Sequence, residues 1–98
     1  MPGLNKIIHE RARLLILTYL AINEKKEISF NELQESLKFS SGNLSVQLRK
    51  LQQADYVAIY KTFKENKPYT TISITHPGSD ALNSYVAEME DIIKTLKK

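Results

Sequence analysis

Hydrophobic residues recur along this chain with a helical spacing in four segments and with a strand-like alternation in two. The helical segments are predicted at Asn5–Asn23, Asn31–Leu37, Ser41–Ala54 and Ser79–Leu96. The two alternating segments predict strands at Tyr56–Phe63 and Tyr69–Ile74, and a short extended segment is predicted at Ile28–Phe30. Polar turns separate these elements at Glu24–Glu27, Lys38–Ser40 and Lys64–Pro68. This order predicts a winged helix-turn-helix: a mainly α fold with a small β-hairpin and an added C-terminal helix.

The predicted helices begin at polar residues that can accept hydrogen bonds from the free amides of a first helical turn. The candidate N-caps are Asn5, Ser29 or Asn31, Ser40 and Thr75. Proline follows the last of these within the first turn, where its fixed φ suits a helix. The helix-turn-helix would then span about residues 31–54, the hairpin or wing about 56–75, and the last helix about 77–97.

Segment Ser41–Ala54 combines a narrow apolar seam with a polar and basic opposite face. Leu44, Leu48 and Leu51 fall within one arc of a helix at 100° per residue. The outer face carries small residues, which allow close approach to DNA, and amide and basic side chains, which can bind base edges and phosphates. The predicted DNA contacts are Ser41, Gly42, Asn43, Ser45, Val46, Gln47, Arg49 and Lys50. The alternative is an ordinary solvated surface helix.

The net charge of +3 is concentrated in one part of the chain. Residues 38–71 contain six basic and two acidic side chains, a net charge of +4, which leaves −1 for the remainder. A localised basic excess is the electrostatic pattern of a nucleic-acid face, although a solvated lysine-rich surface would look the same. The predicted wing contacts are Lys61, Lys64, Asn66 and Lys67.

The first and last predicted helices carry more large apolar side chains than one small domain usually covers. We therefore expect a homodimer in which these two helices form the interface. The predicted interface residues are Leu14, Leu17, Leu82, Tyr85, Val86, Met89, Ile92, Ile93 and Leu96. Such a dimer would hold its two reading helices roughly 34 Å apart, one turn of DNA. A small-molecule effector between the dimer helices could change that spacing, but the sequence identifies none.

Composition argues against several other classes. Ninety-eight residues suit a single domain, and the absence of cysteine excludes disulfides and thiolate metal sites. The longest apolar run, Leu14–Leu17, is too short to span a bilayer, so we expect a cytoplasmic protein without a membrane partner. His9 and His76 are far apart, and no catalytic motif is present, so we expect no metal, no cofactor and no enzymatic activity.

Several motifs resemble those of small winged-helix transcriptional regulators of bacteria and archaea, of the MarR and ArsR type. The similar segments are Ile7–Leu14, Phe30–Leu33, Ser41–Leu51, Lys67–Thr71 and Ile74–Gly78. The resemblance implies a homodimer that binds a palindromic promoter site. The chain departs from it at Tyr69, where similar proteins often carry a basic residue after the wing proline, and in lacking the cysteines of metal-sensing relatives.

The function that the sequence favours is therefore sequence-specific binding of double-stranded DNA by a homodimeric transcriptional regulator. The alternative from a different class is a winged-helix module that docks onto proteins in a larger assembly. Under that alternative, the outer face of Ser41–Ala54 would contact a protein.

Overall fold

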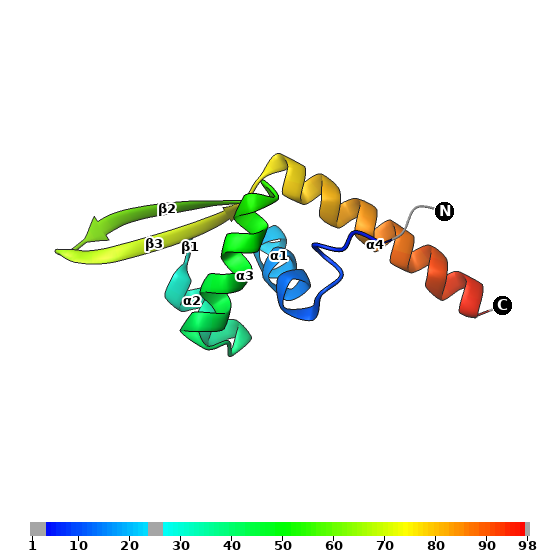
Figure 1. Cartoon of the computed structure of the whole chain (residues 1–98), viewed down its shortest axis with the longest axis horizontal. Helices are drawn as coiled ribbons and strands as arrows, with labels where there is room; N and C mark the ends of the chain where they lie inside the picture. The colour runs from blue at the N-terminus through cyan, green and yellow to red at the C-terminus, as the bar shows by residue number, and fades with distance from the viewer. Residues whose placement is uncertain (1–3, 24–26, 98) are drawn as a thin grey trace.

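The computed structural model describes residues 4–23 and 27–97. Its elements are α1 (Arg11–Ile22), β1 (Ile28–Ser29), α2 (Phe30–Leu37), α3 (Ser41–Gln53), β2 (Val57–Lys64), β3 (Lys67–Ile74) and α4 (His76–Leu96). The order confirms the predicted winged helix. Figure 1 shows the β2–β3 hairpin and α4 extending in opposite directions from a body made of α1, α2 and α3. The molecule is accordingly long and narrow, with extents of 57 × 25 × 22 Å.

Helix α1 starts later than the sequence predicted. The helix begins at Arg11, and its N-cap is Glu10, whose side chain accepts a hydrogen bond from the backbone amide of Arg13. Asn5 instead caps a separate turn, since its Oδ1 accepts from the amides of Ile7 and Ile8. A strong capping residue thus stabilised a local turn six residues before the helix. Of the predicted loop Glu24–Glu27, all but the last residue lies outside the described residues.

The three strands form one antiparallel sheet in the order β1-β3-β2. The hairpin between β2 and β3 closes through Glu65 and Asn66, which have φ values of 54° and 64°. Two consecutive residues with positive φ are typical of a two-residue type I′ turn. The predicted turn Lys64–Pro68 is therefore shorter, and Pro68 lies within β3. Proline is tolerated there because β1 pairs only with Thr71 and Ile72, which leaves β3 an unpaired edge at Pro68.

The hydrophobic core joins every element of the body to the base of the hairpin and the first half of α4. The leucine seam of α3 is buried as predicted, with Leu44, Leu48 and Leu51 at 0%, 3% and 0% exposure. Further fully buried side chains come from the segment before α1 and from the other elements: Ile8, Ile16, Leu17, Leu20, Ile28, Leu33 and Ile72. Helix α3 is thus fixed along one side, which leaves its other side to solvent.

Three residues of the predicted dimer interface belong to this core instead. Leu17 is completely buried, and Leu82 and Tyr85 are each 6% exposed within a single protomer. The prediction was wrong for them because α1 and the start of α4 pack against each other and α1 also contacts α2, α3 and β3. Leu14, Met89 and Ile92 are half-buried, and Val86, Ile93 and Leu96 are exposed.

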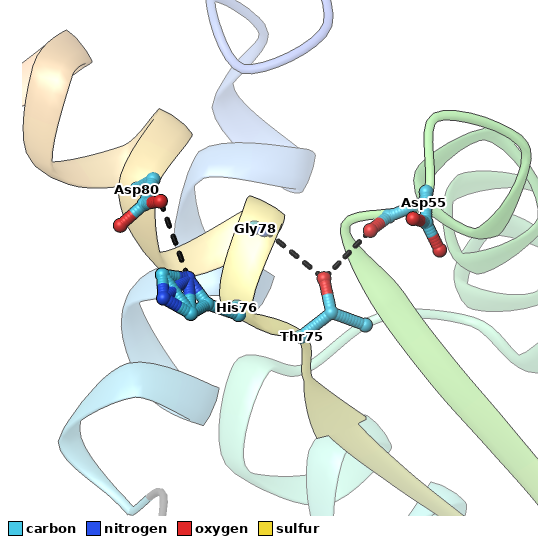
Figure 2. Close-up of polar contacts among 5 residues, drawn as sticks. All are labelled: Asp55, Thr75, His76, Gly78 and Asp80. Carbon is cyan, nitrogen blue, oxygen red and sulfur yellow. Dashed lines mark hydrogen bonds and ion pairs between the residues drawn. The ribbon is translucent and has the colours of Figure 1, made fainter.

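The hairpin passes into α4 through one tightly bonded residue. Thr75 is the N-cap of α4, as predicted, and its Oγ1 accepts from the amide of Gly78 at 3.0 Å. The same hydroxyl donates to the carbonyl of Asp55 at 2.6 Å, as Figure 2 shows. The amide of Thr75 also donates to the carbonyl of Tyr56 at 3.0 Å. The start of α4 is therefore bonded to the segment that links α3 to β2.

Candidate nucleic-acid interface

Helix α3 follows α2 after a turn whose geometry is set by two residues. Lys38 ends α2 in the left-handed conformation, with φ of 58°. Ser40 then caps α3, and its Oγ accepts from the amide of Asn43 at 3.1 Å. Two helices joined by a turn this short form the predicted helix-turn-helix.

The outer face of α3 is accessible along its length. All but one of the predicted DNA contacts on this helix are exposed: Ser41, Gly42, Asn43, Ser45, Val46, Arg49 and Lys50. No atom lies within 4 Å of where a side chain on Gly42 would begin, so this position offers open space for another molecule. Val46 is 40% exposed and is flanked by polar residues, as expected of a side chain that could meet a thymine methyl.

Gln47 is the exception, because it is only 9% exposed. Its Oε1 accepts from Nη1 of Arg13 at 2.7 Å, and its Nε2 donates to Oδ1 of Asn43 at 3.1 Å. A direct DNA contact by Gln47 is therefore not compatible with this structure. Arg13, a half-buried residue of α1, was not predicted from the sequence, because no local pattern connects it to α3.

The predicted wing residues Lys61, Lys64, Asn66 and Lys67 are all exposed on the β2–β3 hairpin. Nζ of Lys64 lies 4.8 Å from the centre of the Tyr69 ring, a cation–π distance. Tyr69 is the residue at which the chain departs from similar regulators. Its ring here contacts the ammonium group of Lys64, one of the predicted wing residues. The basic character of the wing is kept by three lysines close to its tip.

Two exposed aromatic residues of the wing were not singled out from the sequence. Phe63 is 74% and Tyr60 is 61% exposed. The register pairs Phe63 with Pro68 and Ile59 with Ile72, and because side chains alternate along a strand these four share one face of the hairpin. Tyr60 lies on the opposite face. Phe63 therefore adds an exposed apolar side chain to the basic tip of the hairpin.

An open groove of about 660 Å³ separates α3 from the hairpin. It is lined by Phe30, Ser45, Leu48, Arg49, Gln52, Ile59, Lys61 and Thr70. Because Ile59 lies on its wall, the groove faces the same side of the hairpin as Phe63. Arg49 from the helix and Lys61 from the strand bring two cationic side chains to this groove, which suits a polyanionic backbone.

The described residues hold no group of three or more His, Cys, Asp or Glu side chains that could bind a metal ion. Nδ1 of His9 instead lies 2.7 Å from the hydroxyl of Tyr85 on α4, and His76 pairs with the adjacent-turn Asp80 at 3.2 Å (Figure 2). Both histidines thus have local structural partners. None of the helices in residues 4–23 and 27–97 has the length and apolar character needed to cross a membrane.

A family model described as "Winged helix DNA-binding domain" matches residues 12–93. The chain belongs to this family. The chain is also 33% identical over 92 residues to an uncharacterized protein of Methanocaldococcus jannaschii. That match covers 94% of this chain and 98% of that protein. The fold of the chain is also that of a transcriptional regulator homologue from Pyrococcus horikoshii, with a TM-score of 0.86 and 25% identity over 94% of this chain and 89% of that one.

This winged helix domain also shares its fold with Staphylococcus aureus MepR. The structure of the MepR–DNA complex matches with a TM-score of 0.71 and 17% identity, over 88% of this chain and 61% of MepR. At that identity the likeness concerns the fold alone. MarR-family transcriptional regulators are therefore structural neighbours of the chain, as the sequence motifs indicated.

Proposed function

We propose that this protein regulates transcription as a homodimer that binds a palindromic promoter site. Helix α3 enters the major groove, and the β2–β3 hairpin contacts the flanking backbone or minor groove. The observation that carries the proposal is the exposed face of α3, from Ser41 to Lys50, beside a hairpin with three exposed lysines. A buried leucine seam holds that face in place, so α3 can dock on DNA without rearrangement of the core.

The individual contacts follow from the side chains that α3 presents. Arg49 is best suited to bind guanine, because its planar guanidinium can donate to O6 and N7 together. Lys50 and Lys61 are suited to phosphates, which fix position without reading sequence. Val46 supplies an apolar surface for a thymine methyl. The free amides at the start of α3, next to Ser41, favour a phosphate through the positive end of the helix dipole.

The dimer part of the proposal is supported by the second half of α4. Val86, Ile93 and Leu96 are 43%, 43% and 78% exposed. With the half-buried Met89 they follow a 3-4-3 spacing, which is the heptad seam of paired helices. The same seam is buried at Leu82 by the protomer's own body, is half-buried at Met89 and is exposed at Leu96. Figure 1 shows α4 extending away from that body. A second copy would cover the exposed part of the seam.

Fluorescence anisotropy with a labelled duplex tests DNA binding. We expect the affinity to fall steeply as salt is raised, because phosphate contacts release counterions. On a selected duplex, Arg49→Ala is expected to weaken binding by about tenfold or more. Lys94→Ala removes the same charge from the far end of α4 and is the matched control, with affinity unchanged.

Selection of bound duplexes from a random pool tests sequence specificity and symmetry together. We expect two inverted half-sites about 10 base pairs apart, centre to centre. The proposal fails if no salt-sensitive binding is found, or if Arg49→Ala and Lys94→Ala bind alike. In that case the exposed face of α3 would serve the alternative function of docking onto a protein.

A further inference from the structure

Three side chains from two helices form a continuous hydrogen-bonded relay that ends at the exposed face of α3. Nη1 of Arg13, in α1, donates to Oε1 of Gln47 at 2.7 Å. Nε2 of Gln47 donates to Oδ1 of Asn43 at 3.1 Å. Gln47 is buried and Asn43 is exposed, so the relay runs from the interior to the surface that we propose for DNA.

The direction of the relay follows from the chemistry of its first member. A guanidinium has donors only, so the Gln47 atom beside Arg13 must be its carbonyl oxygen. The amide nitrogen of Gln47 therefore faces Asn43, and because that nitrogen is a donor, the Asn43 atom beside it must be an oxygen. The planar amide of Asn43 then directs its own nitrogen, Nδ2, away from Gln47.

Arg13 is itself fixed from both sides. Its Nε donates to the backbone carbonyl of Ile7 at 2.6 Å, and its backbone amide donates to the capping carboxylate of Glu10 at 3.1 Å. Hydrogen bonds from a charged donor are shorter and stronger than neutral ones. The orientation of the Gln47 amide is thus imposed by a cation that the N-terminal segment and the start of α1 hold in place.

We propose that Arg13, through Gln47, sets the polarity with which Asn43 reads DNA, so that Asn43 donates from Nδ2 to an acceptor on a base edge. The acceptors in the major groove that suit a lone donor are O6 and N7 of guanine, N7 of adenine and O4 of thymine, whereas cytosine offers only a donor, N4. The inference rests on the proposed function. It makes Arg13 a positioning residue that contributes to specificity without touching DNA.

Two substitutions reverse this polarity. In Gln47→Glu the side chain has acceptors only, so it still binds Arg13 but now requires Asn43 to donate inward and to present Oδ1 outward. In Asn43→Asp the carboxylate still accepts from Gln47 and presents its second oxygen outward. Both variants would read a donor, N4 of cytosine or N6 of adenine, in place of an acceptor.

The test is selection from a random duplex pool, with wild type, Gln47→Glu, Asn43→Asp and Asn43→Ala compared base pair by base pair. We expect Asn43→Ala to lose discrimination at one position of each half-site. At that position wild type should select a base with an acceptor, guanine, adenine or thymine, and discriminate against cytosine. Both polarity variants should favour a base with a donor, cytosine or adenine, on the same strand, and the preference for cytosine should rise by about tenfold over wild type.

Arg13→Met completes the test. Without a cation to orient Gln47, preference at the position assigned to Asn43 should fall at least severalfold, while preference at the Arg49 positions stays as in wild type. Circular dichroism and thermal unfolding of each variant check that the fold is kept. If the change at the buried Gln47 unfolds the protein, the exposed Asn43→Asp still tests the polarity.

The inference is overturned if the polarity variants bind with the wild-type base preference at every position. It is also overturned if wild type selects cytosine at the position that Asn43→Ala identifies. Either result would leave the proposed function standing, because wild type would still bind duplex DNA with salt sensitivity. Absence of such binding by wild type would instead refute the proposed function itself.

Discussion

Replacing Gly78 with alanine is expected to separate α4 from the segment between α3 and β2. A Cβ on Gly78 would lie 2.1 Å from the carbonyl oxygen of Tyr56 and 2.9 Å from its carbonyl carbon. Ordinary contacts of this kind begin at about 3.4 Å, and both neighbours are backbone atoms that cannot rotate away. The first turn of α4 would therefore have to move by about 1 Å.

The energetic cost can be worked out from the contacts at this position. Overpacking of this kind costs about 1–3 kcal/mol. Movement of α4 also strains the bonds from Thr75 to the carbonyls of Tyr56 and Asp55, at 3.0 Å and 2.6 Å, and each such bond contributes about 1 kcal/mol. Alanine recovers up to about 1 kcal/mol through its better helix propensity. The net expectation is a loss of about 2–4 kcal/mol.

Gly42→Ala is the matched control, because Gly42 is also helical and has no atom within 4 Å of a Cβ. We expect it to keep or slightly raise stability. Urea denaturation followed by circular dichroism, at one protein concentration for all proteins, measures both variants. Unfolding of Gly78→Ala at the same urea concentration as Gly42→Ala would show that the approach of Gly78 to Tyr56 does not limit the side chain at this position.

Further substitutions separate the roles proposed for the wing and for α4. Lys67→Gln should weaken binding to all duplexes alike and lower the slope of log affinity against log salt by about one. Phe63→Ser should also weaken binding, because an apolar contact is lost, but leave that salt slope unchanged; an unchanged affinity would show that Phe63 does not meet DNA. Ile93→Glu should give a monomer in sedimentation velocity, whereas a dimer in that variant would rule out the α4 seam. Thr75→Val should cost about 1 kcal/mol of stability, and Thr75→Ser should restore it.

The elements that the sequence predicted well are those determined by neighbouring residues. The position of α3 was predicted because Leu44, Leu48 and Leu51 repeat at the helical period and Ser40 supplies the cap. The predicted start of α1 was wrong because Asn5 is a preferred capping residue and Glu10 is not, yet the helix follows Glu10 and Asn5 caps a separate turn.

The orientation of Gln47 could not be predicted from local pattern. On a helical wheel this residue lies at the border of the leucine seam, where either burial or exposure is compatible with the periodicity. Its burial depends on Arg13, a partner 34 residues earlier in the chain. The sequence contains both residues but no signal that pairs them, so the candidate site included Gln47 and omitted Arg13.

For the apolar residues of α1 and α4, the sequence predicted burial but not the partner that buries them. Periodicity correctly indicated that Leu17, Leu82 and Tyr85 are buried, but it does not show which chain buries them. The division becomes visible only in the fold, where the large apolar side chains of α4 are buried up to Tyr85, Met89 is half-buried against the core, and Leu96 is exposed. The remaining seam, from Val86 to Leu96, stays a prediction of dimerisation.

A single residue, Thr75, separates the end of β3 from the start of α4. Because a helix turns by 100° per residue, the direction in which the seam of α4 faces depends on where the helix starts, which is directly after Thr75. Inserting one residue after Thr75 would turn Val86, Ile93 and Leu96 by more than a quarter of a circle relative to α3. The length of this junction therefore sets which way the seam of α4 faces, whereas substitutions on the surface of the wing leave that direction unchanged.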